Sequence, residues 1–137
     1  MKSFIVVALG LLYASTAFAQ RSAKAAPWKE METFHEVMAK TFHPMEEGNL
    51  QPIMARAGEM AEKAKLWADT KAPAQFDKPA IKDLLVKLKD ESKALAELVA
   101  AKGSEADIKK SLTALHDRFH EITGACKTDG HGKKHKH

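Results

Sequence analysis

Apolar residues recur every three or four positions over four stretches of the chain, and polar residues fill the positions between them. The stretches cover residues 28–42, 49–70, 78–102 and 104–124. This spacing places the apolar side chains on one face of an α-helix, so each stretch is predicted to be an amphipathic helix. No stretch alternates apolar and polar residues as a half-buried strand would. The sequence therefore predicts an all-α fold.

The repeating apolar positions define the predicted core. They are Met31, Phe34, Met38 and Phe42 in the first helix; Leu50, Ile53, Ala57, Met60, Ala64 and Trp67 in the second; Ile81, Leu84, Leu85, Leu88, Leu95, Leu98 and Val99 in the third; and Ile108, Leu112, Leu115, Phe119 and Ile122 in the fourth. A chain of this length can bury such a core without disulfides.

Residues that favour helix ends mark the predicted boundaries. Pro44 is expected to end the first helix, because a proline pushes the residue before it out of the helical region. Asn49 is expected to cap the second helix and Asp77 the third. Ser104 is expected to open the fourth, with Asp107 three residues on, close to a capping box. The short connections favour an up-down-up-down four-helix bundle whose first and last helices are antiparallel neighbours.

Residues 1–19 have the composition of a secretion signal. Lys2 gives a positive start, an apolar stretch follows, and Ala17-Phe18-Ala19 matches an A-x-A cleavage pattern. We expect cleavage before Gln20 and a mature protein in the periplasm. The apolar part is too short to span a membrane and no later stretch is long enough, so no stable membrane insertion is expected.

The remaining chain is expected to form one domain with a tail. Residues 20–126 make up the predicted bundle, and residues 127–137 a His- and Lys-rich tail that is expected to be disordered. The formal net charge is +4 with both signs mixed along the chain, which does not indicate a nucleic-acid surface. No nucleophile with a base beside it, catalytic carboxylate pair or phosphate-binding loop is present, so we expect no enzyme.

Histidines gather near the two ends of the mature chain. His116 and His120 lie four positions apart, so both project from one side of the last predicted helix, a spacing at which two imidazoles can chelate a transition-metal ion. His35 lies in the apolar stripe of the first helix. A single histidine on such a face is usually structural, but three histidines on one helix pair favour a site.

A copper or zinc ion is one possible occupant of this site. His35, His116 and His120 would be its ligands, and the thioether of Met31 or Met38 would favour copper(I).

Three further groups have weaker signals. His43 with Glu46 or Glu47 could form a second, exposed metal site, although helix-end capping is the simpler role. Histidines in the tail can bind divalent metals weakly; they are His131, His135 and His137. The lone Cys126 is expected to be a small buried hydrophobe.

Residues 111–119, Ser-Leu-Thr-Ala-Leu-His-Asp-Arg-Phe, resemble the haem-binding end of the cytochrome c′ and cytochrome b562 superfamily of periplasmic four-helix bundles. The histidine of the C-x-x-C-H motif matches His116, while its two cysteines match Leu112 and Leu115, so no covalent haem c is expected. The b562 branch also lacks the cysteines. Its axial methionine lies in a Met-Glu-Thr segment of the first helix, which residues 31–33 match.

This resemblance implies a non-covalent haem b held by Met31 and His116, with electron transfer to a periplasmic redox partner as the role. A helix register shifted by one turn, about 5.4 Å, would instead set His35 opposite His116 and Met31 opposite His120. That arrangement suits a bis-histidine haem, copper or zinc.

Two other functions stay open from the sequence. One is a haem-free copper- or zinc-binding protein of the envelope that receives its ion from a metal donor. The other is a cofactor-free structural or chaperone-like helical protein, with its histidines on a pH-sensitive surface. A monomer or a homodimer is expected in each case.

Overall fold

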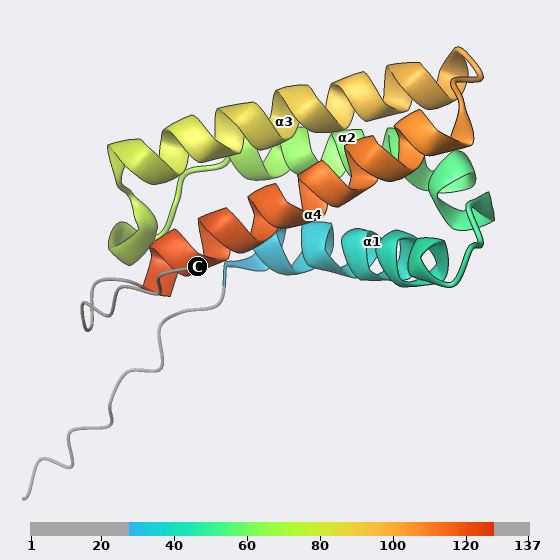
Figure 1. Cartoon of the computed structure of the whole chain (residues 1–137). Helices are drawn as coiled ribbons and strands as arrows, with labels where there is room; N and C mark the ends of the chain where they lie inside the picture. The colour runs from blue at the N-terminus through green and yellow to red at the C-terminus, as the bar shows by residue number, and fades with distance from the viewer. Residues whose placement is uncertain (1–27, 128–137) are drawn as a thin grey trace, which may run out of the picture.

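The computed structural model describes residues 28–127, which form four long helices (Figure 1). These are α1 (Lys29–Glu46), α2 (Gln51–Asp69), α3 (Pro79–Ala100) and α4 (Glu105–Lys127), with a short 3-10 turn, η1 (Ala74–Phe76), between α2 and α3. No strand occurs in residues 28–127, so the predicted all-α fold is confirmed. The predicted secretion signal and all but the first residue of the tail lie outside the described residues.

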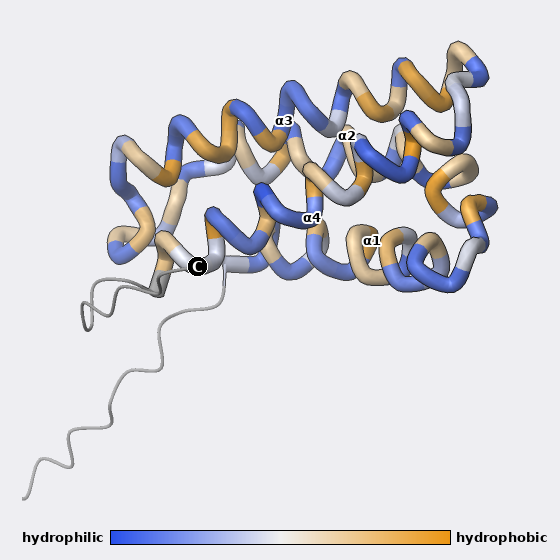
Figure 2. Tube along the Cα trace, in the orientation of Figure 1, coloured by the Kyte–Doolittle hydropathy of each residue, from blue (hydrophilic) through white to orange (hydrophobic). Residues whose placement is uncertain are grey.

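The helices pack side by side around one core. Each helix contacts the next in sequence, and α1 also contacts α4 along the least extensive of the four interfaces. Hydrophilic and hydrophobic residues alternate along each helix as its turns pass between the outer and inner faces (Figure 2). No helix within residues 28–127 is both long and apolar enough to cross a membrane.

The buried residues largely match the predicted stripes. The largest fully buried side chains are Trp28, Trp67, Phe34, Met38, Ile53, Met60, Ile81, Leu88, Leu95, Leu112, Leu115 and Ile122. At one end of the bundle Trp28 stacks on Phe76, with ring centroids 5.5 Å apart, and meets Trp67 edge-on at 5.6 Å. Such aromatic pairs add stability beyond the area that they bury.

Pro44 does not end the first helix, so this boundary was wrong. It lies inside the last turn of α1, which continues to Glu46. A proline there removes only one helical N–H near the solvated end, and the extra turn buries Met45 in the core. The N–H of Asn49 then closes the turn by donating to the Pro44 carbonyl at 2.8 Å.

The other predicted capping residues agree with the observed helix starts to different degrees. The Ser104 hydroxyl accepts the N–H of Asp107 at 3.1 Å and donates to its carboxylate at 2.8 Å, which confirms the start of α4. Leu50, rather than Asn49, is the residue that precedes α2, although the Asn49 side chain accepts the N–H of Gln51 at 3.1 Å. Lys78, rather than Asp77, is the residue that precedes α3.

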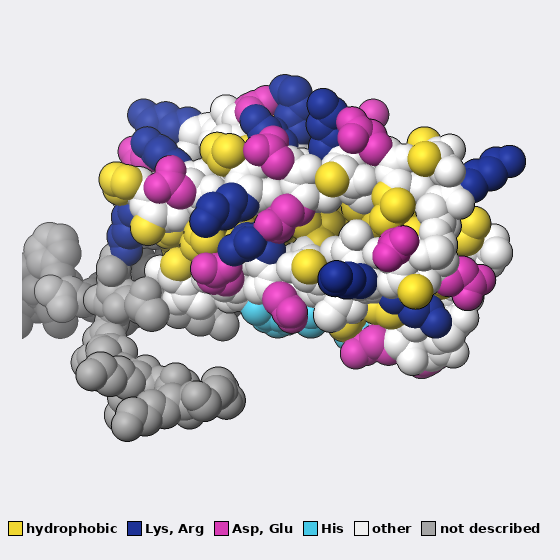
Figure 3. Space-filling view, turned by 45° about the horizontal axis from the view of Figure 1, so that its top comes forward, with side chains coloured by type: hydrophobic (Ala, Val, Ile, Leu, Met, Phe, Trp, Pro, Cys, Tyr) yellow, Lys and Arg dark blue, Asp and Glu magenta, His cyan; other side chains and the backbone are white. Residues whose placement is uncertain are grey.

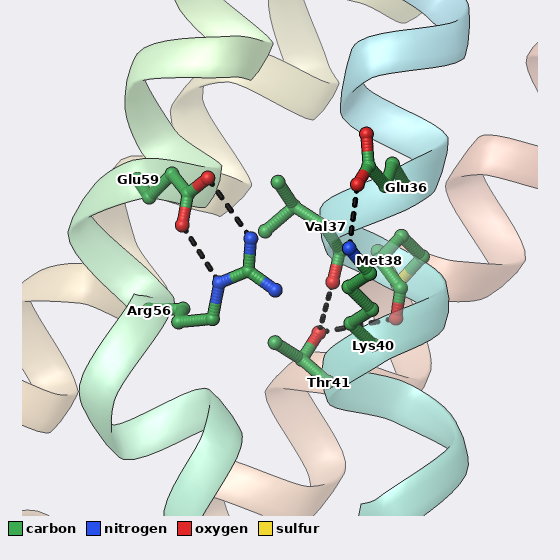
Figure 4. A network of polar contacts seen from close by, with 7 residues as sticks. All are labelled: Glu36, Val37, Met38, Lys40, Thr41, Arg56 and Glu59. Carbon is green, nitrogen blue, oxygen red and sulfur yellow. Dashed lines mark hydrogen bonds and ion pairs between the residues drawn. The ribbon is translucent and has the colours of Figure 1, made fainter.

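Polar contacts along α1 and α2 stay mostly within each helix (Figure 4). The buried Thr41 hydroxyl donates to the carbonyls of Val37 and Met38 at 2.9 and 3.1 Å, so it costs little to bury. On the outer surfaces Lys40 pairs with Glu36, and Arg56 with Glu59. These partly exposed pairs contribute little to stability.

The turn between α3 and α4 depends on close backbone approach. Lys102 adopts a left-handed φ of 55°, and Gly103 donates its N–H to the carbonyl of Leu98 at 2.9 Å. A Cβ at Gly103 would lie 2.3 Å from the Leu98 side chain, which itself packs against the core. Only glycine therefore fits at position 103 without displacing Leu98.

We predict that Gly103→Ala destabilises the bundle by about 1–3 kcal/mol, because Leu98 must leave its packed position. Gly58→Ala is the matched control, since a Cβ at Gly58 meets nothing within 4 Å. It should instead stabilise α2 by about 0.5–1 kcal/mol. Urea unfolding followed by circular dichroism measures both changes, and equal stabilities of the two variants would contradict the steric argument.

Candidate metal centre

Packing of α4 against α3 turns the histidines of α4 toward α1. The Arg118 guanidinium donates to the Glu91 carboxylate of α3 at 2.8 Å and also pairs with Glu121. Residues two positions before and after Arg118 lie on the opposite side of the helix, because each step turns by about 100°. His116 and His120 therefore lie on the side of α4 nearer α1.

The rings of His116 and His120 meet through their outer nitrogens. The two Nε2 atoms are 3.1 Å apart, and the ring centroids are 4.4 Å apart with planes at 80°. At this distance one imidazole N–H donates to the ring nitrogen of the other. His120 is exposed, whereas the His116 side chain is only 24% exposed. Histidine side chains form one group at the lower edge of the face in Figure 3.

Phe42 of α1 fixes the orientation of His116. The two rings stack in parallel planes with centroids 3.8 Å apart. This contact covers one face of the imidazole, and burial lowers the pKa of His116 below its ordinary 6.5. The nearby His120 lowers this pKa further, while Asp117 opposes the shift. The neutral imidazole, which is the form that binds metals, is therefore favoured.

A groove of about 490 Å³ runs beside His120 between α1 and α4. Its lining residues are Met31, His35, Phe76, Phe119, His120, Thr123 and Cys126. The exposed His35 ring stacks on Phe119, with centroids 4.9 Å apart and planes at 4°. The groove thus combines aromatic walls with imidazole and sulfur donors.

The observed helix register brings together some of the predicted ligands and separates others. Phe34 and His35 of α1 contact Phe119, while Phe42, about two turns later, contacts His116, so α1 and α4 run in opposite directions. His35 and His120 both border the groove, together with Met31.

Met31 and His116 are not opposite each other. Met31 precedes Phe42 by eleven residues, or about 16 Å of helix, and Phe42 is the residue that covers His116. The haem ligand pair Met31 and His116 therefore does not fit this conformation.

The remaining predicted ligands lie apart from the groove. Met38 is 1% exposed and belongs to the core. His43 is exposed near the end of α1, where its Nδ1 is 3.3 Å from a carboxylate oxygen of Glu46. Within residues 28–127 no group of three or more His, Cys, Asp or Glu side chains is placed to hold a metal ion together.

Two features of the site were not predicted from the sequence. Phe42 was assigned to the core stripe, and only the fold shows that its ring also covers His116. Cys126 was expected to be a buried hydrophobe, yet it is half-buried and lines the groove. Burial raises the pKa of its thiol, so the protonated form is favoured.

The described residues therefore present a preformed pair of imidazole nitrogens beside a groove with soft donors. Such a pair can bind a borderline transition-metal ion, and the groove has the volume of a small-ligand site. No family model, curated protein or solved structure matches the chain.

The lowered pKa of His116 predicts a pH-dependent stability. The unfolded chain takes up the proton near pH 6.5, before the folded protein does, so the free energy of unfolding falls as the pH drops below about 6.5 and levels off below the folded pKa. The charges around His116 are those of His120, Asp117, Glu46 and His43.

Urea midpoints between about pH 5 and about pH 8 test this dependence. His116→Gln should reduce the slope of stability against pH, and His43→Gln is the comparison variant. An NMR titration midpoint for His116 above 6.5 would show that burial does not control this group.

Proposed function

We propose that the protein binds a transition-metal ion, copper or zinc, through the Nε2 atoms of His116 and His120. The observation that carries this proposal is their separation of 3.1 Å. Zinc–nitrogen bonds of about 2.0–2.1 Å that meet at about 90–110° place two nitrogens about 2.8–3.4 Å apart. The separation of the two nitrogens therefore lies within the range that a shared ion requires.

The surroundings of the pair support ion binding near neutral pH. Metal ions bind the neutral imidazole, so every bound proton competes with the metal. The lowered pKa of His116 reduces this competition. Imidazole ligands suit both copper and zinc.

The rest of the proposal concerns the protein as a whole. We propose a binding protein rather than an enzyme, built as an up-down-up-down bundle and exported to the periplasm after cleavage before Gln20. The opposed directions of α1 and α4 support this topology, and Ala17-Phe18-Ala19 supports the cleavage. The protein recovered from the periplasm should have the mass of a chain that begins at Gln20.

A second candidate is non-covalent haem b in the α1–α4 groove. The groove favours it because Met31, His35 and His120 border a volume of about 490 Å³ with aromatic walls. His120 with either His35 or Met31 would be the axial ligands, and a bound haem would supply a one-electron redox centre. His35 would first have to leave Phe119.

Titration of the purified chain with copper, zinc and hemin distinguishes these candidates. We predict one bound copper or zinc ion per chain. Loss of a partner that only orients a ligand typically costs about 10–100-fold in affinity, so loss of the ligand itself in His116→Ala or in His120→Ala should cost at least as much. Competition with a chromophoric chelator measures the affinities. His43→Ala, which changes an exposed histidine outside the pair, should bind as the unsubstituted chain does.

Unchanged ion affinity in both α4 variants would refute the metal proposal. A Soret shift on addition of hemin that disappears in His120→Ala would favour the haem candidate. Absence of both metal and hemin binding would leave a cofactor-free structural role.

A further inference from the structure

The groove between α1 and α4 has aromatic walls that are backed by the core. Phe119, which lines the groove, is 6% exposed and packs against Phe34 and Trp67, with ring centroids 5.9 and 6.0 Å apart. Phe76, which also lines it, stacks on Trp28 at 5.5 Å with planes at 7°. Core contacts therefore hold both walls, and the groove is a preformed feature of the bundle, as small-molecule sites usually are.

The groove has a polar end and an apolar end. His35 and His120 both rest on Phe119, one stacked on its face at 4.9 Å and the other at 5.7 Å with planes at 68°. Met31 lies one helical turn before His35, about 6 Å along α1. Phe76 lies beyond it, since Phe76 stacks on the residue that precedes α1. The imidazoles therefore form one end of the groove, and Met31 and Phe76 the other.

The charges around the groove favour an anion. None of the described residues that line the groove is acidic. A neutral imidazole has one N–H donor and a protonated imidazole has two, so His35 and His120 can donate to an anion in either form. The Thr123 hydroxyl already donates to the His120 carbonyl at 3.1 Å. Beside the apolar end, the positive charge of Lys78 opposes the burial that raises the pKa of Cys126.

We propose that this groove binds a small aromatic carboxylic acid. Its carboxylate accepts N–H groups of His35 and His120, and its ring lies against Phe76 and Met31. Hydrogen bonds to an ionised acceptor are stronger than those between neutral groups. An aromatic wall favours a flat ring, and a thioether makes favourable contacts with such a ring.

This ligand goes beyond the proposed metal binding and needs no metal ion. It also differs from the haem candidate, because there the imidazoles would give a nitrogen lone pair to iron, whereas here they donate a proton to an oxygen. From His120 to Cys126 the helix rises about 9 Å, a span that an acid with two fused aromatic rings fills. We therefore choose 2-naphthoate as the probe.

The experiment titrates the metal-free full chain with 2-naphthoate and follows its two-dimensional NMR spectra. The chain has two tryptophans, and their indole N–H signals report on the groove because Trp28 contacts Phe76 and Trp67 contacts Phe119. Two comparison ligands separate the contributions of charge and ring. 2-Naphthamide has the same rings without the charge, and octanoate has the charge without a ring.

Two variants are titrated beside the unsubstituted chain. The imidazole variant (His35→Ala, His120→Ala) removes both proposed donors, and His43→Ala removes an exposed histidine of α1 that does not line the groove. Circular dichroism confirms that each variant keeps its helix content.

We expect one naphthoate per chain, with shifts of both indole signals and of the amide signals of Thr123 and Cys126. The imidazole variant should bind about 10-fold more weakly or worse, because hydrogen bonds to a charged group contribute more than those between neutral groups. His43→Ala should bind as the unsubstituted chain does. 2-Naphthamide and octanoate should each bind more weakly than 2-naphthoate.

Each contrary result overturns a named part of the proposal. Shifts centred on the groove between α2 and α3, which Lys65, Lys89 and Lys93 line, would show that charge alone attracts the acid. Undiminished affinity in the imidazole variant would refute the role of the two histidines. Octanoate binding as tightly as naphthoate would refute the aromatic class. Absence of naphthoate binding would overturn the whole inference and leave the metal proposal standing, because the titration contains no metal ion.

Discussion

The geometry of the candidate site depends on Phe119, whose ring lies at the seam between α1 and α4. It packs against Phe34 at 5.9 Å and Trp67 at 6.0 Å between centroids, and its outer face carries the stacked ring of His35. Burying an aromatic ring of this size contributes about 1.5–3 kcal/mol, and a slip of one helical turn would forfeit these contacts together. Phe119 therefore sets the register that decides which donors of α1 face which donors of α4.

The rotation of α4 about its own axis has a different origin. Ile108, Leu112 and Leu115 are buried on its inner face, and this burial fixes which side turns inward. The ion pair between Arg118 and Glu91 then holds the flank toward α3. A partly exposed pair contributes only about 0–1 kcal/mol, so it supports a rotation that the core has already determined. His116 and His120 consequently lie at the opposite flank, at the edge of the core.

The sequence was sufficient to predict the four helices but not the register in which α1 packs against α4. Local signals located the start of α4, because the contacts between Ser104 and Asp107 join residues three positions apart. The prediction that the first helix ends at Pro44 was wrong, because burial of Met45 outweighs one missing hydrogen bond at a solvated helix end. The chelating spacing of His116 and His120 was readable for the same local reason. The register of α1 against α4 could not be predicted, because the two alternative registers bury the same apolar stripes. The contacts that decide between registers, those of Phe34 and Phe42 with α4, join residues far apart in the sequence.

Two buried leucines of α4 explain why the candidate site lies at the surface between α1 and α4. Leu112 and Leu115 are both 0% exposed. Leucines so placed fill the space on the inner face of α4, and emptying it would cost about 2–5 kcal/mol for each residue. His116 then keeps one face against Phe42 and directs its Nε2 toward His120 instead of the interior. A small ion can bind at the paired nitrogens without any opening of this core, whereas a larger group such as haem would need more space. This difference is the physical reason to propose an ion at this position.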